Sequence, residues 1–367
     1  MPLSKQFEAC GYEELPGWSN DNHALALTAF QRCGAHAAVK PYRTGSLGVE
    51  SAAFAKAFSA ALHSNLSDGA SARQFFEAYF LPFWVRPTDR ERGFVTGYYE
   101  PIVHASHSRT ERFCYPVYRR PADLISIDDS NRPEGFDPYL AFARQTGNGL
   151  EAYFDRSAIE QGALQDQGLE IAWLADRVDL FFIHVQGAAR LRFEDGSEKR
   201  ITYAAKSGHR FSGPGGILAD LGEIPRQQVT MQSIRKWFDA NPDRIDEILW
   251  QNRSFIFFRE AAVDDPSLGP VAAAKVPLTP GRSMAVDRLL HTFATPFFVH
   301  AGTLTHVDGA PFSRLMIAQD TGSAITGPAR GDLFVGSGQS AGEIAGIIKH
   351  DADFFALLPR QLVMDQA

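Results

Sequence analysis

Two aspartates in the C-terminal third carry the clearest chemical signal in the sequence. Asp320 ends an apolar run and enters a turn that contains glycine, and Asp332 begins the next apolar run. Glycines at 322, 327, 331, 336 and 338 let the backbone turn tightly and approach a bulky ligand closely. Two carboxyl groups on neighbouring loops of one sheet can do acid and base chemistry. The alternative is that both only cap turns, because Asp readily accepts backbone N–H bonds there.

The segments that must position these aspartates are predicted to be strands. Short apolar runs bounded by Gly, Pro, Asn and Asp predict strands at residues 254–258, 283–286, 296–300, 315–318 and 333–335. The same pattern predicts a small β domain in the middle of the chain, with strands at residues 94–99, 115–118, 178–185 and 190–193.

Helices are predicted on either side of the middle domain. Apolar residues at four-residue spacing predict a helical section in the first ninety residues, with a capping box formed by Ser71 and Gln74. A longer helix is predicted over residues 230–249, and a last one begins at Ser340, with Glu343 as its capping partner. The fold class is therefore mixed and mainly β, with flanking helices.

Composition excludes several classes of partner. The chain of 367 residues has a net charge of -7, so it lacks a basic field able to hold nucleic acid. Its three cysteines fit neither a disulfide framework nor a zinc site, and His104 and His107 have no third ligand. We expect no metal and no cofactor. No signal peptide and no apolar run of membrane-spanning length is visible.

The segment LMIAQDTGSAITGPARGDLFVGSG, at 315–338, resembles the three-aspartate (3D) domain of the membrane-bound lytic murein transglycosylase A family. Asp287, Asp320 and Asp332 match that domain's three aspartates in order. Segments elsewhere also resemble the family, so the resemblance covers most of the chain: LPGW at 15–18, TGYYEP at 96–101, EIAWLADRVDLFFIHVQG at 170–187, MQSIRKW at 231–237 and NRSFIFFRE at 252–260.

The resemblance implies a two-domain architecture. We expect a double-psi β-barrel catalytic domain formed by residues 1–100 and 240–367. A second β domain, residues 101–239, is expected to be inserted into it, with a substrate cleft between the two domains.

The resemblance also implies the reaction. Such enzymes cleave the bond between N-acetylmuramic acid and N-acetylglucosamine in peptidoglycan, and the muramyl 6-hydroxyl attacks its own anomeric carbon to give a 1,6-anhydro ring. Because attack is intramolecular, one carboxyl group can serve as acid and then as base. Position in the motif assigns that role to Asp332. Asp320 would raise the pKa of Asp332 or stabilise an oxocarbenium-like state, whereas Asp287 either takes part directly or supports a turn.

The resemblance also implies substrate-binding residues, partners and a cellular location. Family-like segments supply Thr96, Gly97, Tyr98, Tyr99, Gln186 and Gly187 as expected substrate-binding residues, with aromatic faces and polar groups suited to N-acetylated sugars. Tyr203 and Lys206 are added to this set, and the alternative for each residue is a place in the core or on the surface. The expected partners are peptidoglycan strands and proteins of cell-wall synthesis or division. The expected location is the periplasm or the periplasmic face of the outer membrane.

Two other functions fit parts of the sequence. Asp-Thr-Gly-Ser-Ala at 320–324 is also the local signature of aspartic proteases, which need two such aspartates sharing a proton. With one such motif, a protease would have to be a homodimer. A catalytically silent peptidoglycan-binding protein is the second alternative, although all three aspartates are retained.

Overall fold

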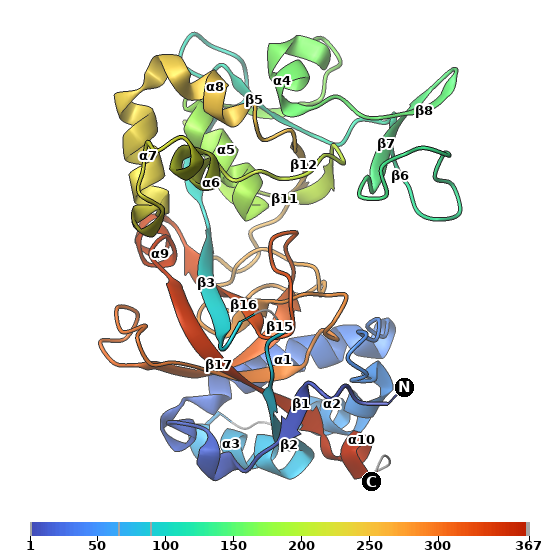
Figure 1. Cartoon of the computed structure of the whole chain (residues 1–367), viewed down its shortest axis with the longest axis vertical. Coiled ribbons are helices and arrows are strands. Elements are labelled where there is room, and N and C mark those ends of the chain that lie inside the picture. The colour runs from blue at the N-terminus through green and yellow to red at the C-terminus, as the bar shows by residue number, and fades with distance from the viewer. Residues whose placement is uncertain (1, 65–66, 89, 365–367) are drawn as a thin grey trace. The chain divides into compact units, whose positions relative to one another are not determined.

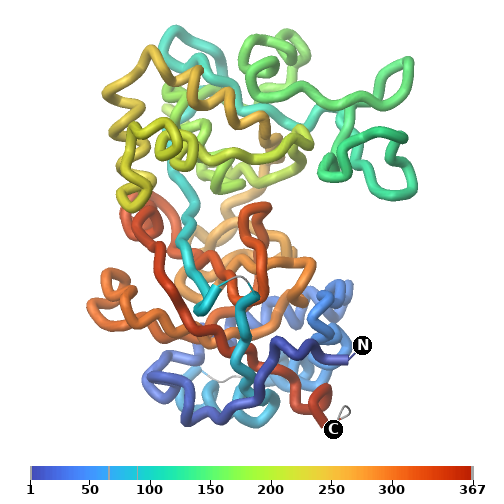
Figure 2. The backbone as a smooth tube through the Cα atoms, viewed as in Figure 1, coloured from blue at the N-terminus to red at the C-terminus, as the bar shows by residue number. Residues whose placement is uncertain are grey.

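The computed structural model describes residues 2–64, 67–88 and 90–364, and the chain divides into two compact units. The first unit combines residues 1–99 with residues 266–367, and the second contains residues 100–265. The blue and red ends of the chain both run through the first unit (Figure 2). The mixed, mainly β fold class is confirmed.

A closed barrel forms the centre of the first unit. Its eight-stranded sheet has the order β1-β2-β17-β14-β15-β13-β16-β3, and β3 also pairs with β17, which closes the last six strands on themselves. Figure 1 labels β1, β2, β3, β15, β16 and β17 of this sheet. The strands are β1 (Phe7–Ala9), β2 (Phe80–Val85), β3 (Gly93–Glu100), β13 (Ser283–Ala285), β14 (Pro296–Ala301), β15 (Phe312–Asp320), β16 (Arg330–Ser337) and β17 (Lys349–Pro359). The double-psi connection of this barrel stays a prediction.

Helices from the N-terminal segment cover part of this barrel. α1 packs against α2, α3 and β15, and fully buried rings of Phe30, Phe76 and Phe80 fill the space between helices and sheet. Each such ring contributes roughly 2 kcal/mol through burial. The helices of this unit are α1 (His23–Val39), α2 (Ala55–Leu62), α3 (Gly69–Tyr79), α9 (Gln339–Ala345) and α10 (Arg360–Met364), with 3-10 turns at Tyr12–Glu14, Trp18–Asn20 and Ser51–Phe54.

The second unit contains two sheets and a group of helices. A six-stranded sheet has the order β12-β11-β10-β4-β9-β5. A three-stranded sheet has the order β6-β7-β8, and its strands are labelled in Figure 1. Their strands are β4 (Ile102–Ser106), β5 (Tyr115–Tyr118), β6 (Leu124–Ser126), β7 (Phe142–Thr146), β8 (Gly149–Glu151), β9 (Glu170–Leu174), β10 (Ala188–Phe193), β11 (Glu198–Lys206) and β12 (Ile256–Ala261). This unit continues past residue 239, because β12 pairs with β11.

The helices of the second unit include one at a predicted strand. They are α4 (Arg156–Ala158) followed by a π-type turn (Ile159–Ala163), α5 (Arg177–Gln186), α6 (Pro214–Asp220), α7 (Met231–Ala240) and α8 (Ile245–Leu249), with 3-10 turns at Arg226–Gln228 and Pro242–Arg244. The predicted helix over residues 230–249 is thus two helices, because Pro242 lacks the N–H that would continue the first.

The strand predicted at residues 178–185 is wrong, since these residues form α5. Leu180 and Ile183 pack on the six-stranded sheet, whereas Phe181 and Phe182 pack on the other helices, so no polar face reveals the helical period. The helix begins where the Asp176 side chain accepts hydrogen bonds from the backbone N–H groups of Val178 and Asp179, and it ends at a left-handed glycine.

The two predicted capping boxes are also wrong. The N-cap of α3 is Asp68, whose carboxylate accepts from the Ser71 backbone N–H, so Ser71 lies inside the helix. α9 begins after Gly338, whose φ of 86° suits glycine, and no side chain caps it. Glu343 instead accepts a hydrogen bond from the Gln339 side chain.

Candidate active site

Strand register brings the two motif aspartates to one face of the barrel sheet. Ala285 of β13 is the antiparallel partner of Asp332 in β16 and the parallel partner of Asp320 in β15. Directly opposite residues in neighbouring strands project to the same face. The small Ala285 side chain therefore lies between the two carboxyl groups.

Asp332 makes one direct side-chain hydrogen bond. The Thr96 hydroxyl of β3 donates to Asp332 Oδ1 over 2.5 Å, and Arg330 Nη2 donates to Thr96 Oγ1 over 2.7 Å. Within the described part of the chain, Asp332 Oδ2 has no hydrogen-bond partner. An arginine, a hydroxyl and a carboxyl group thus form a relay that leaves one carboxyl oxygen available to a ligand.

Asp320 is held more tightly by its surroundings. The Tyr98 hydroxyl donates to Asp320 Oδ2 over 3.0 Å, and the backbone N–H groups of Thr321 and Ala273 donate to Oδ1 over 2.9 and 3.3 Å. Thr96 and Tyr98 lie two positions apart on β3, so alternation along one strand supplies a hydroxyl to each aspartate.

Burial shifts both carboxyl groups toward protonation. It raises the pKa of Asp320 to about 6, although hydrogen bonds from Thr321 and Tyr98 oppose the shift. It also raises the pKa of Asp332, against the opposing charge of Arg330 and the hydrogen bond from Thr96. The negative charge of Asp332 further raises the pKa of Asp320, so the two groups affect each other.

An apolar cluster accounts for this desolvation. Tyr98, Leu278, Ala285, Ile325 and Phe334 pack together, and each is less than a tenth exposed. Ala285 separates the aspartates, and Tyr98 bonds one of them. Both aspartates keep intermediate exposure, so a ligand can reach carboxyl groups set in an apolar wall.

Asp287 stands apart from this pair in its contacts. Its two carboxylate oxygens accept from the backbone N–H groups of Leu289 and Gly327, each over 3.0 Å. Gly327 belongs to the loop that joins Asp320 to Asp332 and has a φ of 107°. These contacts fit a residue that fixes that loop, and a direct part in the reaction stays a prediction.

The other predicted residues are distributed over both units. Gly97 faces α9 so closely that a Cβ there would lie 3.0 Å from the Ala345 backbone, and buried Tyr99 lies beside Gly342. In the second unit, Gln186 and Gly187 end α5, and the Gly187 carbonyl accepts from the Tyr203 backbone N–H over 2.8 Å. Lys206 ends β11, with its Nζ 4.9 Å from the Tyr139 ring centroid.

Arg330 is the site residue that the sequence analysis missed. It lies two positions before Asp332 in β16, so alternation places both side chains on one face of the strand. A cation beside a catalytic carboxyl group is a recognisable signal, but its contact with Thr96 spans 234 positions of the chain. Within the described residues, no three His, Cys, Asp or Glu side chains group as metal ligands.

Comparison with known proteins agrees with this geometry. The family descriptions "MltA specific insert domain" and "3D domain" match residues 94–259 and 282–358. Together with the barrel and its aspartates, they define a protein in which a 3D domain is combined with an inserted β domain.

Solved and curated relatives define the family further. A crystal structure of membrane-bound lytic murein transglycosylase from Agrobacterium tumefaciens is 49% identical and covers 99% of this chain and 100% of that one, with a TM-score of 0.93. The chain belongs to the membrane-bound lytic murein transglycosylase A (MltA) family.

Escherichia coli provides two further comparisons. The curated K12 relative is 33% identical over 261 residues, a match that spans 70% of this chain and 62% of the relative. The E. coli MltA structure with bound chitohexaose is 26% identical, covers 98% of this chain and 95% of that one, and has a TM-score of 0.67.

Proposed function

We propose that the protein is a peptidoglycan lytic transglycosylase that cleaves the bond between N-acetylmuramic acid and N-acetylglucosamine and leaves 1,6-anhydro ends. The observation that carries this proposal is Asp332, whose pKa is raised by burial and whose Oδ2 is unpartnered among the described residues. Burial favours the protonated form of this carboxyl group, and its open oxygen lets that form donate a proton to a ligand. Its relatives' names, which specify lytic murein transglycosylase, support the same reaction.

Each step of the reaction has a group in the site. Protonated Asp332 donates its proton to the departing glycosidic oxygen. The resulting carboxylate then takes the proton of the muramyl 6-hydroxyl, whose oxygen attacks the anomeric carbon. The Thr96 hydroxyl stabilises the carboxylate formed in the first half, with Arg330 supporting that hydroxyl. Attack within one sugar needs no activated water, so the paired carboxylates of hydrolytic glycosidases are not required.

Asp320 has a different task in this proposal. With a pKa of about 6 it is mostly ionised at pH 7, so its charge can stabilise positive charge that develops on the sugar ring. Its backbone and Tyr98 hydrogen bonds fix its position. We assign Asp320 to electrostatic stabilisation and Asp287 to support of the loop between the aspartates.

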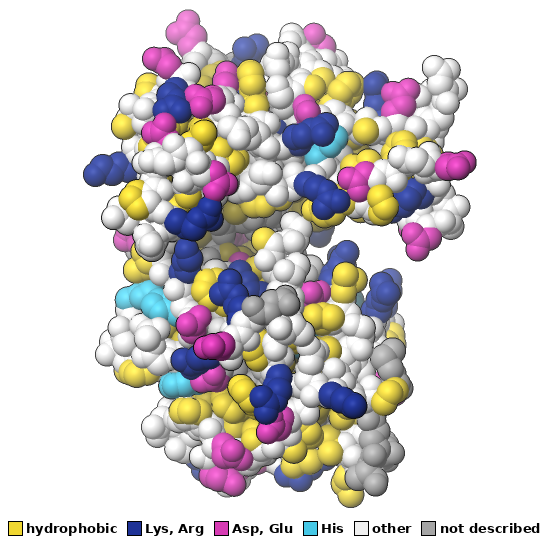
Figure 3. All heavy atoms as spheres, in the orientation of Figure 1, with side chains coloured by type: hydrophobic (Ala, Val, Ile, Leu, Met, Phe, Trp, Pro, Cys, Tyr) yellow, Lys and Arg dark blue, Asp and Glu magenta, His cyan; other side chains and the backbone are white. Residues whose placement is uncertain are grey.

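The substrate assignment rests on chemistry and on relatives. The E. coli relative holds chitohexaose, which supports a saccharide ligand here. Thr96, Gly97, Tyr98, Tyr99, Gln186, Gly187, Tyr203 and Lys206 are our proposed sugar-binding residues. A net charge of -7, and a face on which acidic and basic side chains are interspersed (Figure 3), disfavour nucleic acid as the polymer.

We further propose that the protein acts at the cell envelope, where peptidoglycan lies. Relatives named "membrane-bound" support this location. Across the described residues, the helices are all too short or too polar to span a bilayer. Proteins of cell-wall synthesis or division are the proposed protein partners.

The test is digestion of purified sacculi, followed by mass spectrometry of the soluble products. Wild type should release muropeptides with anhydro ends, and Asp332→Asn should lower their yield by about 10³-fold because acid and base are lost together. Asp308→Asn is the matched control, since Asp308 pairs with Arg314 at the surface of the same unit.

Other products would overturn the proposal. Reducing, non-anhydro ends would identify a hydrolase, and binding of sacculi without release would identify a silent binding protein. Pepstatin-sensitive cleavage of a peptide would identify an aspartic protease.

A further inference from the structure

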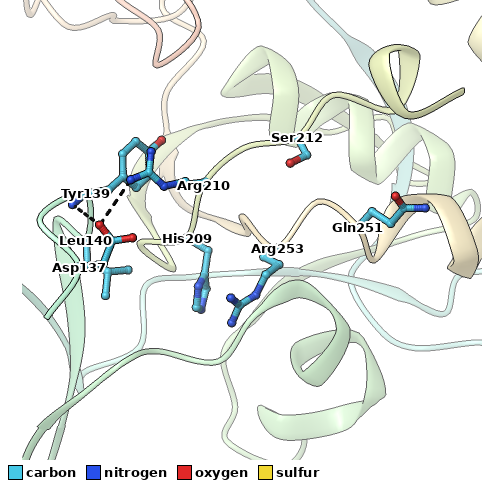
Figure 4. Close-up of a pocket in the computed structure, with 8 residues that line it drawn as sticks. All are labelled: Asp137, Tyr139, Leu140, His209, Arg210, Ser212, Gln251 and Arg253. Atoms are coloured by element: carbon cyan, nitrogen blue, oxygen red, sulfur yellow. Dashed lines mark hydrogen bonds and ion pairs between the residues drawn. The ribbon is translucent and has the colours of Figure 1, made fainter. Parts of the chain in front are cut away.

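A second concave site lies wholly within the inserted unit. It is a pocket of about 180 Å³, and its polar lining comes from Asp137, Tyr139, His209, Arg210, Ser212, Gln251 and Arg253 (Figure 4). None of these residues belongs to the aspartate site of the first unit. Its side chains therefore need an explanation other than the acid and base chemistry described above.

Two arginines and one carboxylate, Asp137, line this pocket, and Lys206 lies near it. The guanidinium of Arg210 lies 4.3 Å and the Nζ of Lys206 lies 4.9 Å from the Tyr139 ring centroid. Among the described residues, the one ion pair of Arg210 is a long one with Asp137, at 3.4 Å, so Arg210 keeps donors for a ligand. Arg253 bonds Asp155 through its Nε, and among the described residues its two terminal nitrogens have no protein partner. The pocket thus presents guanidinium donors suited to a carboxylate.

His209 adds an acceptor to these donors. Its Nε2 lies 2.7 Å from the Tyr153 carbonyl oxygen, and a carbonyl can only accept, so Nε2 carries the proton. Burial lowers the pKa of His209, which favours the neutral ring. The neutral ring's Nδ1 is then a lone-pair acceptor, and within the described part of the chain it has no hydrogen-bond partner.

The combination of groups selects a class of ligand. A simple inorganic anion would use the arginines but would leave the histidine acceptor unsatisfied. A peptide end supplies a carboxylate for the guanidinium groups and an amide N–H for His209 Nδ1. Figure 4 shows His209 and Arg253 side by side, so one short peptide segment can meet both.

We propose that this pocket binds a free carboxylate and the adjacent amide N–H of a stem peptide carried by the glycan strand. The inference rests on the proposed function, because it takes peptidoglycan to be the substrate. The second unit would then recognise glycan strands that carry stem peptides, so these strands are cleaved faster than bare strands.

Direct binding is the first test, and it does not depend on catalysis. Stem tripeptide released from sacculi by an amidase is titrated into the intact protein by calorimetry, next to the same peptide with its carboxylates amidated. We expect the amidated peptide, and the Arg210→Gln and Arg253→Gln variants, each to weaken binding by about fivefold or more. Arg226→Gln, at an exposed ion pair with Asp220 in the same unit, should bind like wild type.

Arg210→Gln keeps the test valid if Arg253→Gln fails to fold, because the Arg210 side chain is 67% exposed. Thermal unfolding of each variant verifies the fold. Absence of tripeptide binding to wild type, or equal binding of the amidated peptide, would overturn the proposal.

A second experiment connects the pocket to turnover. Release of anhydro ends is compared on peptide-bearing strands and on strands stripped by the amidase. Arg210→Gln should slow the first reaction by about fivefold and leave the second unchanged. Equal slowing on both substrates would contradict a peptide-reading role. If wild type releases no anhydro ends from either substrate, the proposed reaction fails while calorimetry still decides the fate of the pocket.

Discussion

Two aspartate regions contact β15, one at Leu315 inside the strand and one at its last residue, Asp320, and they differ in how their charge is balanced. Next to Leu315, Asp21 receives both terminal nitrogens of Arg282 at 2.7 Å and the Leu315 backbone N–H at 2.8 Å. The Asp21 and Arg282 side chains are 3% and 5% exposed. At the end of the strand, Asp320 accepts hydrogen bonds from a tyrosine hydroxyl and backbone N–H groups, and no cation among the described residues bonds it directly.

A directly bonded cation distinguishes the structural carboxylate, Asp21, from the two carboxyl groups of the candidate active site. A bidentate arginine neutralises Asp21 and leaves it no chemistry to do. Asp320 and Asp332 are desolvated without a directly bonded cation, so burial raises the pKa of both. We infer that Asp320 and Asp332 can exchange protons because neither forms the direct ion pair with arginine that Asp21 forms beside the same sheet.

Removing the Asp21 charge should have the largest effect on stability. Asp21→Asn leaves Arg282 buried without its counter-charge, which should lower the free energy of unfolding by about 4 kcal/mol. Urea denaturation measures this loss. The exposed pair of Asp308 and Arg314 is the comparison, and Asp308→Asn should cost less than about 1 kcal/mol. Equal midpoints for the two variants would contradict the structural role of Asp21.

Asp320→Asn should instead raise the free energy of unfolding. The pKa of Asp320 is raised from an ordinary value of 3.8 to about 6, so ionising it in the folded state costs up to about 3 kcal/mol. That cost appears as pH rises from 3.8 to 6 and is fully present above it. The variant should therefore be more stable than wild type at pH 7 by as much as about 3 kcal/mol, with no gain at pH 3.5.

Urea midpoints at both pH values test this prediction. A gain of the same size at both would show that packing, rather than ionisation, is responsible. The variant should also release fewer anhydro ends, which would link the reaction to a residue that destabilises the fold.

Arg330→Gln should have the smallest effect on activity, because it changes only the pKa of Asp332. The Arg330 charge opposes the rise in the pKa of Asp332, so its loss should raise that pKa further. The acid form would then persist to higher pH, and the alkaline fall in activity should move up by roughly half to one pH unit. The pH profile of anhydro-end release measures the shift. Arg330→Lys keeps the charge and should leave the profile closer to that of wild type.

Sequence patterns predicted the parts of this molecule that depend on near neighbours. The strand at 115–118 matches β5, and the short apolar runs around Ala285, Asp320 and Asp332 are strands, because alternation and turn residues are local properties. α5 was missed since its apolar residues face two different cores.

The arrangement of the site depends on contacts that no local pattern encodes. The alignment of Asp320 and Asp332 on either side of Ala285 depends on pairings among three strands. The hydrogen bond between Thr96 and Asp332 spans 236 positions. The resemblance to the family could identify the aspartates, but it could not show that Thr96 contacts a carboxyl group or that Arg330 contacts Thr96.

The pairing of β3 with β17 also has a consequence for biosynthesis. Thr96 is the register partner of Lys349, the first residue of β17, so the strand whose Thr96 hydroxyl bonds Asp332 is fixed by a segment translated after both aspartates. A nascent chain that ends before β17 already contains both aspartates but cannot close the barrel around them. We therefore expect a chain truncated at residue 348 to be inert towards sacculi.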